Sequence, residues 1–336
     1  MNKDNLQEIS DGIKDIFSTQ FTFDVECSKV PHYNDAGFTF ESGQTKKGKT
    51  IETCVLYVDI RNSVALNRNN TKETMGKLYT SFIKSVLWCA DYHGGSVRNI
   101  IGDRVMIVFP PKNCFTTAVD CAVSINTVTN RIMPKRFKDF KCGIGIDYGE
   151  MYVLKTGIIK QGQDTTTYKE LVWIGRPANI ASRLTDIANK EERRTVYSVR
   201  RNPIIVYAIH PWLKGLSLLH QRGITSSTDK EPLYLNTVET VDLSSDEFAN
   251  SISQYSSGEL YMTGGKVLNF ERKEIKSTAK AILMTEDVFK GFVAANPNRD
   301  SVKNKYWKEA SLKIKDYSKK IYEGDVNWAS IDEVKY

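Results

Sequence analysis

Two aspartates stand where apolar strands run into turns. Asp59 follows the apolar run of VLYVDIRNSV, and Asp103 follows Gly102 in SVRNIIGDRVMIVFP. In neighbouring antiparallel strands, both carboxylates would lie at the same end of one sheet. With a backbone carbonyl, two hard oxygen ligands suit Mg²⁺ or Mn²⁺, which keep positions for water and phosphate oxygens. A structural interpretation stays open for each residue, with Asp103 as a turn residue and Asp59 as a strand-end cap.

A second polar pair lies in IGRPANIASRLTDIA, where Asn179 and Arg183 are four residues apart. That spacing puts both on one helix face, from which an amide and a guanidinium can reach ribose or phosphate oxygens. An arginine so placed stabilises the charge that builds up on a transferring phosphoryl group. Taken alone, the pair is equally typical of a polar helix surface.

The elements that must position these residues follow from hydrophobic periodicity. Residues 52 to 60 predict a buried strand, and the apolar positions from Thr71 onward predict a helix that ends at Gly94-Gly95. The two apolar arms around Gly102-Asp103 predict a tight hairpin. A helix at about 113 to 130 and strands near 140 to 147 and 150 to 155 complete the series. The order predicts an α+β fold with a ferredoxin-like βαββαβ core and extra strands.

The rest of the chain gives weaker patterns. We expect an N-terminal helix and a linker (1–50), a core (51–198), an insertion of unknown role (199–277) and a late part of the core (278–336). The N-terminal helix would span 4 to 17, the linker 41 to 50, a further strand 168 to 174, and a helix Gly175 to Ala188. AKAILMTEDVFKGF predicts a strand and then a helix with Thr285 as N-cap, and residues 303 to 322 predict a surface-packing C-terminal helix.

Composition restricts the class of protein. The net charge of +7 is compatible with a polyanionic partner such as a nucleotide. The six cysteines occur singly, without a CxxC pair, which indicates reduced thiols. Because the sequence shows no signal-peptide pattern and no run of about 18 apolar residues, we expect a cytoplasmic protein without a membrane or nucleic-acid partner.

Taken together and in order, the motifs YVDIRNS, GDRVMIVF, GIGIDYGEMYV and GRPANIASRL resemble the catalytic domain of class III nucleotidyl cyclases, over roughly residues 52 to 190. The resemblance implies that Asp59, Asp103 and the Ile60 carbonyl bind two metal ions, Mn²⁺ or Mg²⁺. It also implies that Asn179 orients the ribose and that Arg183 stabilises the transition state. In this family the two sets of residues meet across a homodimer interface. The turn through Ser63 would then be open to the triphosphate.

The base-reading positions depart from the family's purine patterns. Adenylate cyclases carry a lysine and an aspartate there and guanylate cyclases a glutamate and often a cysteine, whereas this chain has Asn99 and Val172. Tyr57 and Trp173 would add bulk, although ordinary aromatic core is an alternative for both. The pattern looks similar to the pyrimidine cyclases of bacterial Pycsar antiphage systems, whose cyclic CMP or cyclic UMP activates a separate effector. Because an asparagine amide can both donate and accept, Asn99 favours CTP over UTP, unless it is a plain surface residue.

Three other functions remain open at this stage. The first is a purine cyclase, and the second is a cyclase-like module that binds a nucleotide without turning it over. The presence of both aspartates with Asn179 and Arg183 disfavours that second alternative. The third is a relative of diguanylate cyclases or polymerase palms, which the absence of a GGDEF-like hairpin disfavours.

Overall fold

The computed structural model describes residues 2–24, 27–160, 163–204, 234–254, 256, 258–262 and 264–334. The chain divides into two compact units. Unit 1 comprises Met1–Lys190 and Thr278–Tyr336, and unit 2 comprises Glu191–Ser277. Unit 2 begins at Glu191, eight residues before the start of the insertion predicted from the sequence at residue 199.

The predicted ferredoxin-like core is confirmed by the strand order of unit 1. Its elements are β2 (Lys46–Ile60), α3 (Lys72–Tyr92), β3 (Ser96–Ile101), β4 (Arg104–Val108), α4 (Cys114–Thr127) and β5 (Cys142–Lys160). The four strands lie in the order β5-β2-β4-β3 with every neighbouring pair antiparallel. This is the arrangement of a βαββαβ core, and it makes β2 a central strand.

Further strands extend this sheet on the β5 side. They are β12 (Ile282–Thr285), β14 (Ile321–Gly324) and β13 (Lys308–Ala310), while β6 (Gln163–Ile174) pairs with β5 and β1 (Phe21–Asp24) with β2. The late strand predicted near 280 therefore belongs to the core sheet, where β12 pairs with β5 in parallel.

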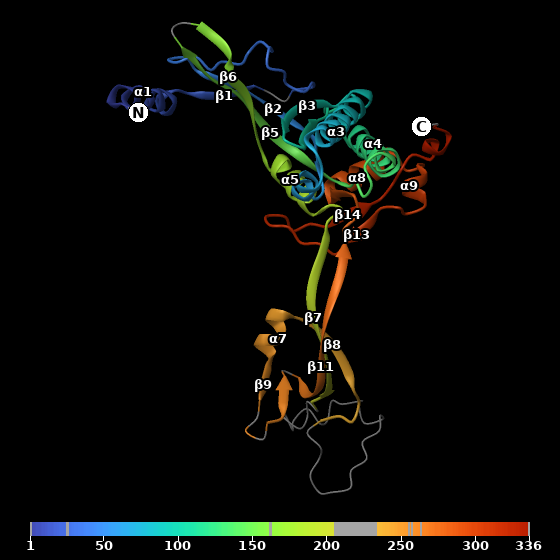
Figure 1. Cartoon of the computed structure of the whole chain (residues 1–336). Helices are drawn as coiled ribbons and strands as arrows, with labels where there is room; N and C mark the ends of the chain where they lie inside the picture. The colour runs from blue at the N-terminus through green and yellow to red at the C-terminus, as the bar shows by residue number, and fades with distance from the viewer. Residues whose placement is uncertain are drawn as a thin grey trace. The chain divides into compact units, whose positions relative to one another are not determined.

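One face of the sheet carries α3, α4 and α8 (Glu286–Ala295), which lie side by side in Figure 1. Apolar side chains of α3 recur every three or four residues, from Met75 and Leu78 to Phe82, Val86 and Ala90, and all are buried. They pack against the buried residues of β2, β4 and β5 in the largest apolar cluster of the described chain.

The opposite face carries α5 (Arg176–Ile187), which touches the backbone of β5. A Cβ placed on Gly145 would lie 2.2 Å from the carbonyl oxygen of Ala181, and one on Gly143 would lie 2.5 Å from that of Ala188. The Thr185 hydroxyl also donates to the Tyr57 carbonyl of β2 at 3.1 Å. Glycines in the GIGIDYG motif thus let the helix that bears Asn179 and Arg183 lie directly on the sheet.

Several sequence predictions are wrong in detail. The predicted C-terminal helix over 303 to 322 is replaced by strands β13 and β14. Its apolar residues are core side chains, because Trp307 is 5% exposed and Ile321 2%. The expected linker runs into β2 from Lys46, and the two strands expected after residue 140 form one 19-residue strand, β5. Thr285 precedes α8 as predicted, but its hydroxyl donates to Asp147 at 2.7 Å instead of capping the helix.

The remaining described elements complete the two units. Unit 1 also has α1 (Lys3–Ser18), α2 (Ser63–Asn69) and α9 (Asp300–Lys303), together with short helical turns at Val128–Ile132, Met133–Lys135 and Ala329–Glu333. Unit 2 has a five-stranded sheet ordered β8-β7-β11-β10-β9 and the helix α7 (Ser245–Ser251). Its strands are β7 (Glu191–Pro203), β8 (Glu239–Ser244), β9 (Ile252–Gln254), β10 (Leu260–Met262) and β11 (Gly265–Thr278). A small apolar cluster around Val199, Met262 and Val267 gives unit 2 its own core.

Candidate active site

The structure brings Asp59 and Asp103 together at one end of the sheet. Asp59 is the penultimate residue of β2, and Asp103 lies in the two-residue turn between β3 and β4. Gly102 takes a positive φ of 62°, which lets that turn close tightly. Because β2 and β4 are antiparallel neighbours, the end of one lies beside the start of the other.

Asp103 is prepared to bind a positive charge. Its Oδ2 atom is buried and has no hydrogen-bond partner in the described chain. Burial and the neighbouring charge of Asp59 raise the pKa of Asp103, against a hydrogen bond from Ser63 that lowers it. A buried carboxylate oxygen without a donor is costly, so this atom is a ready ligand for a cation.

Two arginines surround Asp59. Arg104 donates to Asp59 Oδ2 at 2.9 Å and to the Ser182 hydroxyl of α5 at 2.9 Å, and it also pairs with the Asp186 carboxylate. Arg61 lies 3.5 Å from the same Asp59 oxygen and donates to the Asp186 carbonyl at 3.2 Å. Hydrogen bonds of this kind orient a metal-binding carboxylate and leave its other oxygen for the ion. The two arginines also connect the Asp59 end of β2 to the last turn of α5.

The residues present fit a hard divalent cation. The carboxylate oxygens of Asp59 and Asp103 are hard ligands of the type that Mg²⁺ and Mn²⁺ prefer, and the predicted Ile60 carbonyl would add a third oxygen. Within the described residues no group of three or more His, Cys, Asp and Glu side chains converges. The remaining ligands would therefore come from water and a phosphorylated substrate, as is usual for Mg²⁺.

The second predicted pair lies on α5. Asn179 is exposed, and its side chain makes no hydrogen bond within the described part of the chain. Arg183 is bound to the C-terminal segment, where it donates to Asp316 Oδ2 at 2.8 Å and to the Lys315 carbonyl. Within one chain, therefore, Arg183 pairs with Asp316 and not with the aspartate end of the sheet.

Three of the four candidate base-reading residues, Tyr57, Asn99 and Trp173, lie on the face of the sheet that carries Asp59, and Val172 does not. Tyr57, two residues before Asp59, is half-buried, and burial raises the pKa of its hydroxyl. Met106 pairs with Tyr57 on one side and with Asn99 on the other, so these three side chains share a face. Trp173 pairs with Val153 and packs in the same apolar cluster as Tyr57. Val172 points to the opposite face of β6 and is 40% exposed, because successive strand residues alternate.

Arg98, which the sequence pattern does not single out, lies beside the candidate base-reading residues. The register of β3 shifts between Val97 and Asn99, so Arg98 is the extra residue of a bulge and turns towards the Met106 face. Its guanidinium carbon lies 6.0 Å from the centre of the Trp173 ring. Arg98 Nε and Trp173 Nε1 are both buried, and neither has a hydrogen-bond partner among the described residues. A bulge leaves no clear signal in a sequence, so only the structure could reveal this arginine.

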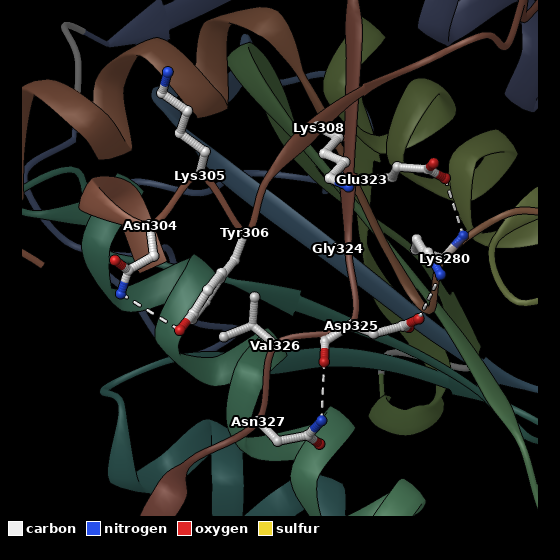
Figure 2. Close-up of a pocket in the computed structure, with 10 residues that line it drawn as sticks. All are labelled: Lys280, Asn304, Lys305, Tyr306, Lys308, Glu323, Gly324, Asp325, Val326 and Asn327. Atoms are coloured by element: carbon white, nitrogen blue, oxygen red, sulfur yellow. Dashed lines mark hydrogen bonds and ion pairs between the residues drawn. The ribbon is translucent and has the colours of Figure 1, made fainter. Parts of the chain in front are cut away.

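Of two pockets on the described surface, each several hundred cubic ångströms in volume, one contains a predicted site residue, Ser63. One, of about 590 Å³, lies along α2 and is lined by Asn62, Ser63, Val64, Ala65, Arg68 and Asn69, of which Ser63 contacts Asp103. Arg68 has no ion pair in the described chain, so it is a free cation beside the predicted triphosphate turn. The other, of about 480 Å³, lies over β13 and β14, with Lys280, Lys305 and Lys308 around it (Figure 2). None of the residues predicted for the site lines this second pocket.

About half of the chain is similar in sequence to known proteins. The chain is 30% identical over 177 residues to the uridylate cyclase of Burkholderia cepacia, across 51% of this chain and 72% of that protein. It is also 30% identical over 175 residues to the uridylate cyclase of Rhodovulum sp. (strain MB263), across 49% and 68%. The chain belongs to the class III nucleotidyl cyclases. Within that family it is related to the pyrimidine cyclases.

Among solved structures, this cyclase is similar to a bacterial light-regulated adenylyl cyclase with a TM-score of 0.45 and 12% identity, over 84% of this chain and 96% of that one. No protein-family model matches the sequence. No helix in the described part of the cyclase is both long and apolar enough to cross a membrane.

Proposed function

We propose that this nucleotidyl cyclase converts a pyrimidine nucleoside triphosphate, preferentially UTP, to the 3′,5′-cyclic monophosphate and pyrophosphate. The observation that carries the proposal is the convergence of Asp59 and Asp103, with a buried Asp103 oxygen that lacks a partner. A non-catalytic nucleotide-binding module would not need this arrangement together with Asn179 and Arg183.

Asp59, Asp103 and the Ile60 carbonyl would hold two Mn²⁺ or Mg²⁺ ions. Bound there, the ions supply Lewis acidity towards the 3′-hydroxyl and the triphosphate. Arg104 and Arg61 hold the Asp59 carboxylate in place, so that its orientation does not depend on the ligand. Asn179 would orient the ribose, and Arg183 would stabilise the charge on the α-phosphate in the transition state.

We propose a homodimer with composite sites, in which α5 of one copy serves the aspartates of the other. The pairing of Arg183 with Asp316 in the single chain supports this, because the arginine is then held away from the aspartates of its own copy. On this proposal the separated monomer is inactive.

The preference for UTP is supported by the chemistry of two buried donors. Arg98 Nε and Trp173 Nε1 have no acceptor in the described chain, and an arginine can only donate. Uracil carries a carbonyl oxygen at C4 where cytosine carries an amino group, so partnerless donors favour uracil. The two relatives are named uridylate cyclases, which also supports UTP. Asn99 favours CTP from the sequence alone, and that preference is untested. CTP is therefore the second candidate substrate.

We also propose that the cyclic nucleotide acts as a second messenger for a separate effector in antiphage defence. The resemblance to Pycsar cyclases supports this role. Cells that carry the cyclase with its effector should resist phage infection, and an Asp103→Asn variant should restore plaque formation to the level of cells without the system.

The decisive experiment supplies the purified chain with equimolar ATP, GTP, CTP and UTP plus Mn²⁺ and identifies the cyclic product by mass. We expect cyclic UMP, and its loss in Asp103→Asn but not in Asp139→Asn, which alters an exposed turn aspartate. Arg98→Gln should lower the ratio of kcat/KM for UTP over CTP by about tenfold, the value of one hydrogen bond to a charged group. Triphosphate binding without any product would contradict the cyclase, and cyclic CMP as the main product would overturn the UTP preference.

A further inference from the structure

The apolar side chains of helix α1 are exposed to solvent. None of its 16 residues is buried. Its large apolar side chains are about half exposed or more: Leu6 53%, Ile9 50%, Ile13 50%, Ile16 49% and Phe17 87%. An amphipathic helix of a globular domain normally buries this side. Figure 1 shows α1 beyond β1, apart from the helices that cover the sheet.

The contacts that anchor α1 come from its polar side. The two carboxylate oxygens of Asp15 accept from the Gly43 backbone N–H at 3.0 and 3.2 Å, and Lys46 lies 4.0 Å from the same carboxylate. At 3.6 residues per turn, Asp15 lies across the helix from the apolar residues. The helix is therefore held by its polar side, and its apolar stripe is left without a partner in the described chain.

The stripe has the spacing of a helix that pairs with another helix. Leu6, Ile9, Ile13 and Ile16 follow one another at intervals of three, four and three residues, which are the a and d positions of a heptad repeat. Such a narrow stripe is typical of a coiled-coil seam, whereas packing on a globular core requires a wider apolar face.

The residues beside the stripe suit an identical helix. Asn5, Ser10 and Gly12 are uncharged, so two copies can approach without like-charge repulsion. A Cβ placed on Gly12 would meet nothing within 4 Å, which leaves room for a close helix pair. A membrane surface is a poorer partner, because α1 has four acidic side chains against two lysines and anionic lipid repels such a helix.

We propose that two copies of this chain associate through α1, with the stripe of Leu6, Ile9, Ile13 and Ile16 packed against the same stripe of the second copy. A seam of about two heptads is too short to hold a dimer alone. The α1 pair therefore adds to the proposed homodimer interface, in which α5 of one copy lies at the aspartates of the other. It is independent of which nucleotide the protein cyclises, and it does not rest on catalysis.

The test measures the dimer dissociation constant of the full chain by analytical ultracentrifugation, in the wild type and in an Ile9→Glu/Ile13→Glu variant. Two buried isoleucines lost from each copy should raise the dissociation constant at least a hundredfold. The matched control, Gln7→Glu/Ser18→Glu, adds the same charges on the polar side and should change it less than threefold. Hydrogen exchange of the α1 amides should slow at concentrations where the wild type is dimeric, and should stay fast in the stripe variant.

An unchanged dissociation constant in the stripe variant would overturn the proposal, as would a wild type that stays monomeric at every concentration. Protection of α1 only after addition of lipid vesicles would assign the stripe to a membrane surface instead. Because α1 buries none of its residues, the variants should keep the wild-type circular dichroism spectrum. The α1 contact rests on the proposed homodimer: a dimer whose dissociation constant does not respond to the stripe variant would overturn the α1 pair alone, whereas a chain that never dimerises would overturn the composite-site dimer as well.

Discussion

Replacing Gly145 by alanine should lower both the activity and the stability of the protein. The new Cβ would lie 2.2 Å from the Ala181 carbonyl oxygen and 2.6 Å from the Thr185 backbone nitrogen, both backbone atoms of α5. Ordinary contact begins at 3.4 Å, so α5 must move away from the sheet by about 1 Å. Overpacking of this size costs about 1–3 kcal/mol. The moved helix carries Asn179 and Arg183, and a 1 Å misplacement at a reacting centre lowers the rate by about 10²-fold.

Urea denaturation would give the change in unfolding free energy, and the initial rate of cyclic-nucleotide formation would give the change in activity. The matched control is Gly76→Ala, in the second turn of α3, where an added Cβ meets nothing within 4 Å. That variant should gain about 1 kcal/mol of stability, because alanine is the better helix former, and should keep wild-type activity. A Gly145→Ala protein with wild-type kcat would refute the claim that α5 is positioned by direct contact with β5.

Three further predictions concern the triphosphate groove, a buried carboxyl and unit 2. Arg68→Gln should raise KM for the nucleotide and weaken pyrophosphate inhibition about tenfold with little change in kcat, and unchanged inhibition would exclude Arg68 from the groove. Burial raises the pKa of Asp147 to about 6, so the folded state binds this proton more tightly than the unfolded state, and stability is lost as the pH rises from about 4 to about 6. Asp147→Asn should remove that loss, which is about 3 kcal/mol at most, in unfolding curves taken across this range. Asn189 donates its backbone N–H to the Ala279 carbonyl at 3.2 Å, so replacing Glu191–Ser277 by two glycines should leave unit 1 folded, with a single cooperative thermal transition.

The elements with strong periodicity could be predicted from the sequence because their patterns depend on burial alone. α3 and α5 match the prediction to within a few residues, and the hairpin at Gly102 has the predicted two-residue turn. The segment from 303 to 322 was misread because its apolar residues are separated by lysines, a spacing that suits a helix surface. In the structure the lysines are exposed, while Trp307, directly before β13, and Ile321 of β14 are buried, and β14 is held in the sheet by pairing with β12. Such long-range pairing overrides local preference.

In the candidate site, too, the residues marked by local sequence patterns could be predicted, and the residue whose position depends on strand register could not. Asp59 and Asp103 could be predicted as site residues because they lie at the end of a strand and in a hairpin turn that the sequence pattern reveals. Antiparallel pairing of β2 and β4 then brings the two carboxylates together. Arg98 could not be predicted, because a one-residue shift in register changes the face to which a side chain points. A position counted from the GD motif therefore leads to Asn99, while the bulge puts Arg98 beside it. Counting along a strand does not tell which side chains share a face once a bulge intervenes.

The Arg104 contacts connect the two halves of the site. Arg104 begins β4, immediately after Asp103, and its guanidinium joins Asp59 of β2 to Ser182 and Asp186 of α5. The glycine contacts hold the middle of α5 against β5, and Arg104 holds its last turn against β2 and β4. Asp59 is thus joined to α5 through charge-assisted hydrogen bonds of one guanidinium. If α5 serves the aspartates of a second copy, as proposed, the same contact couples the two composite sites of the dimer, because each metal carboxylate is bonded to the helix that completes the other site.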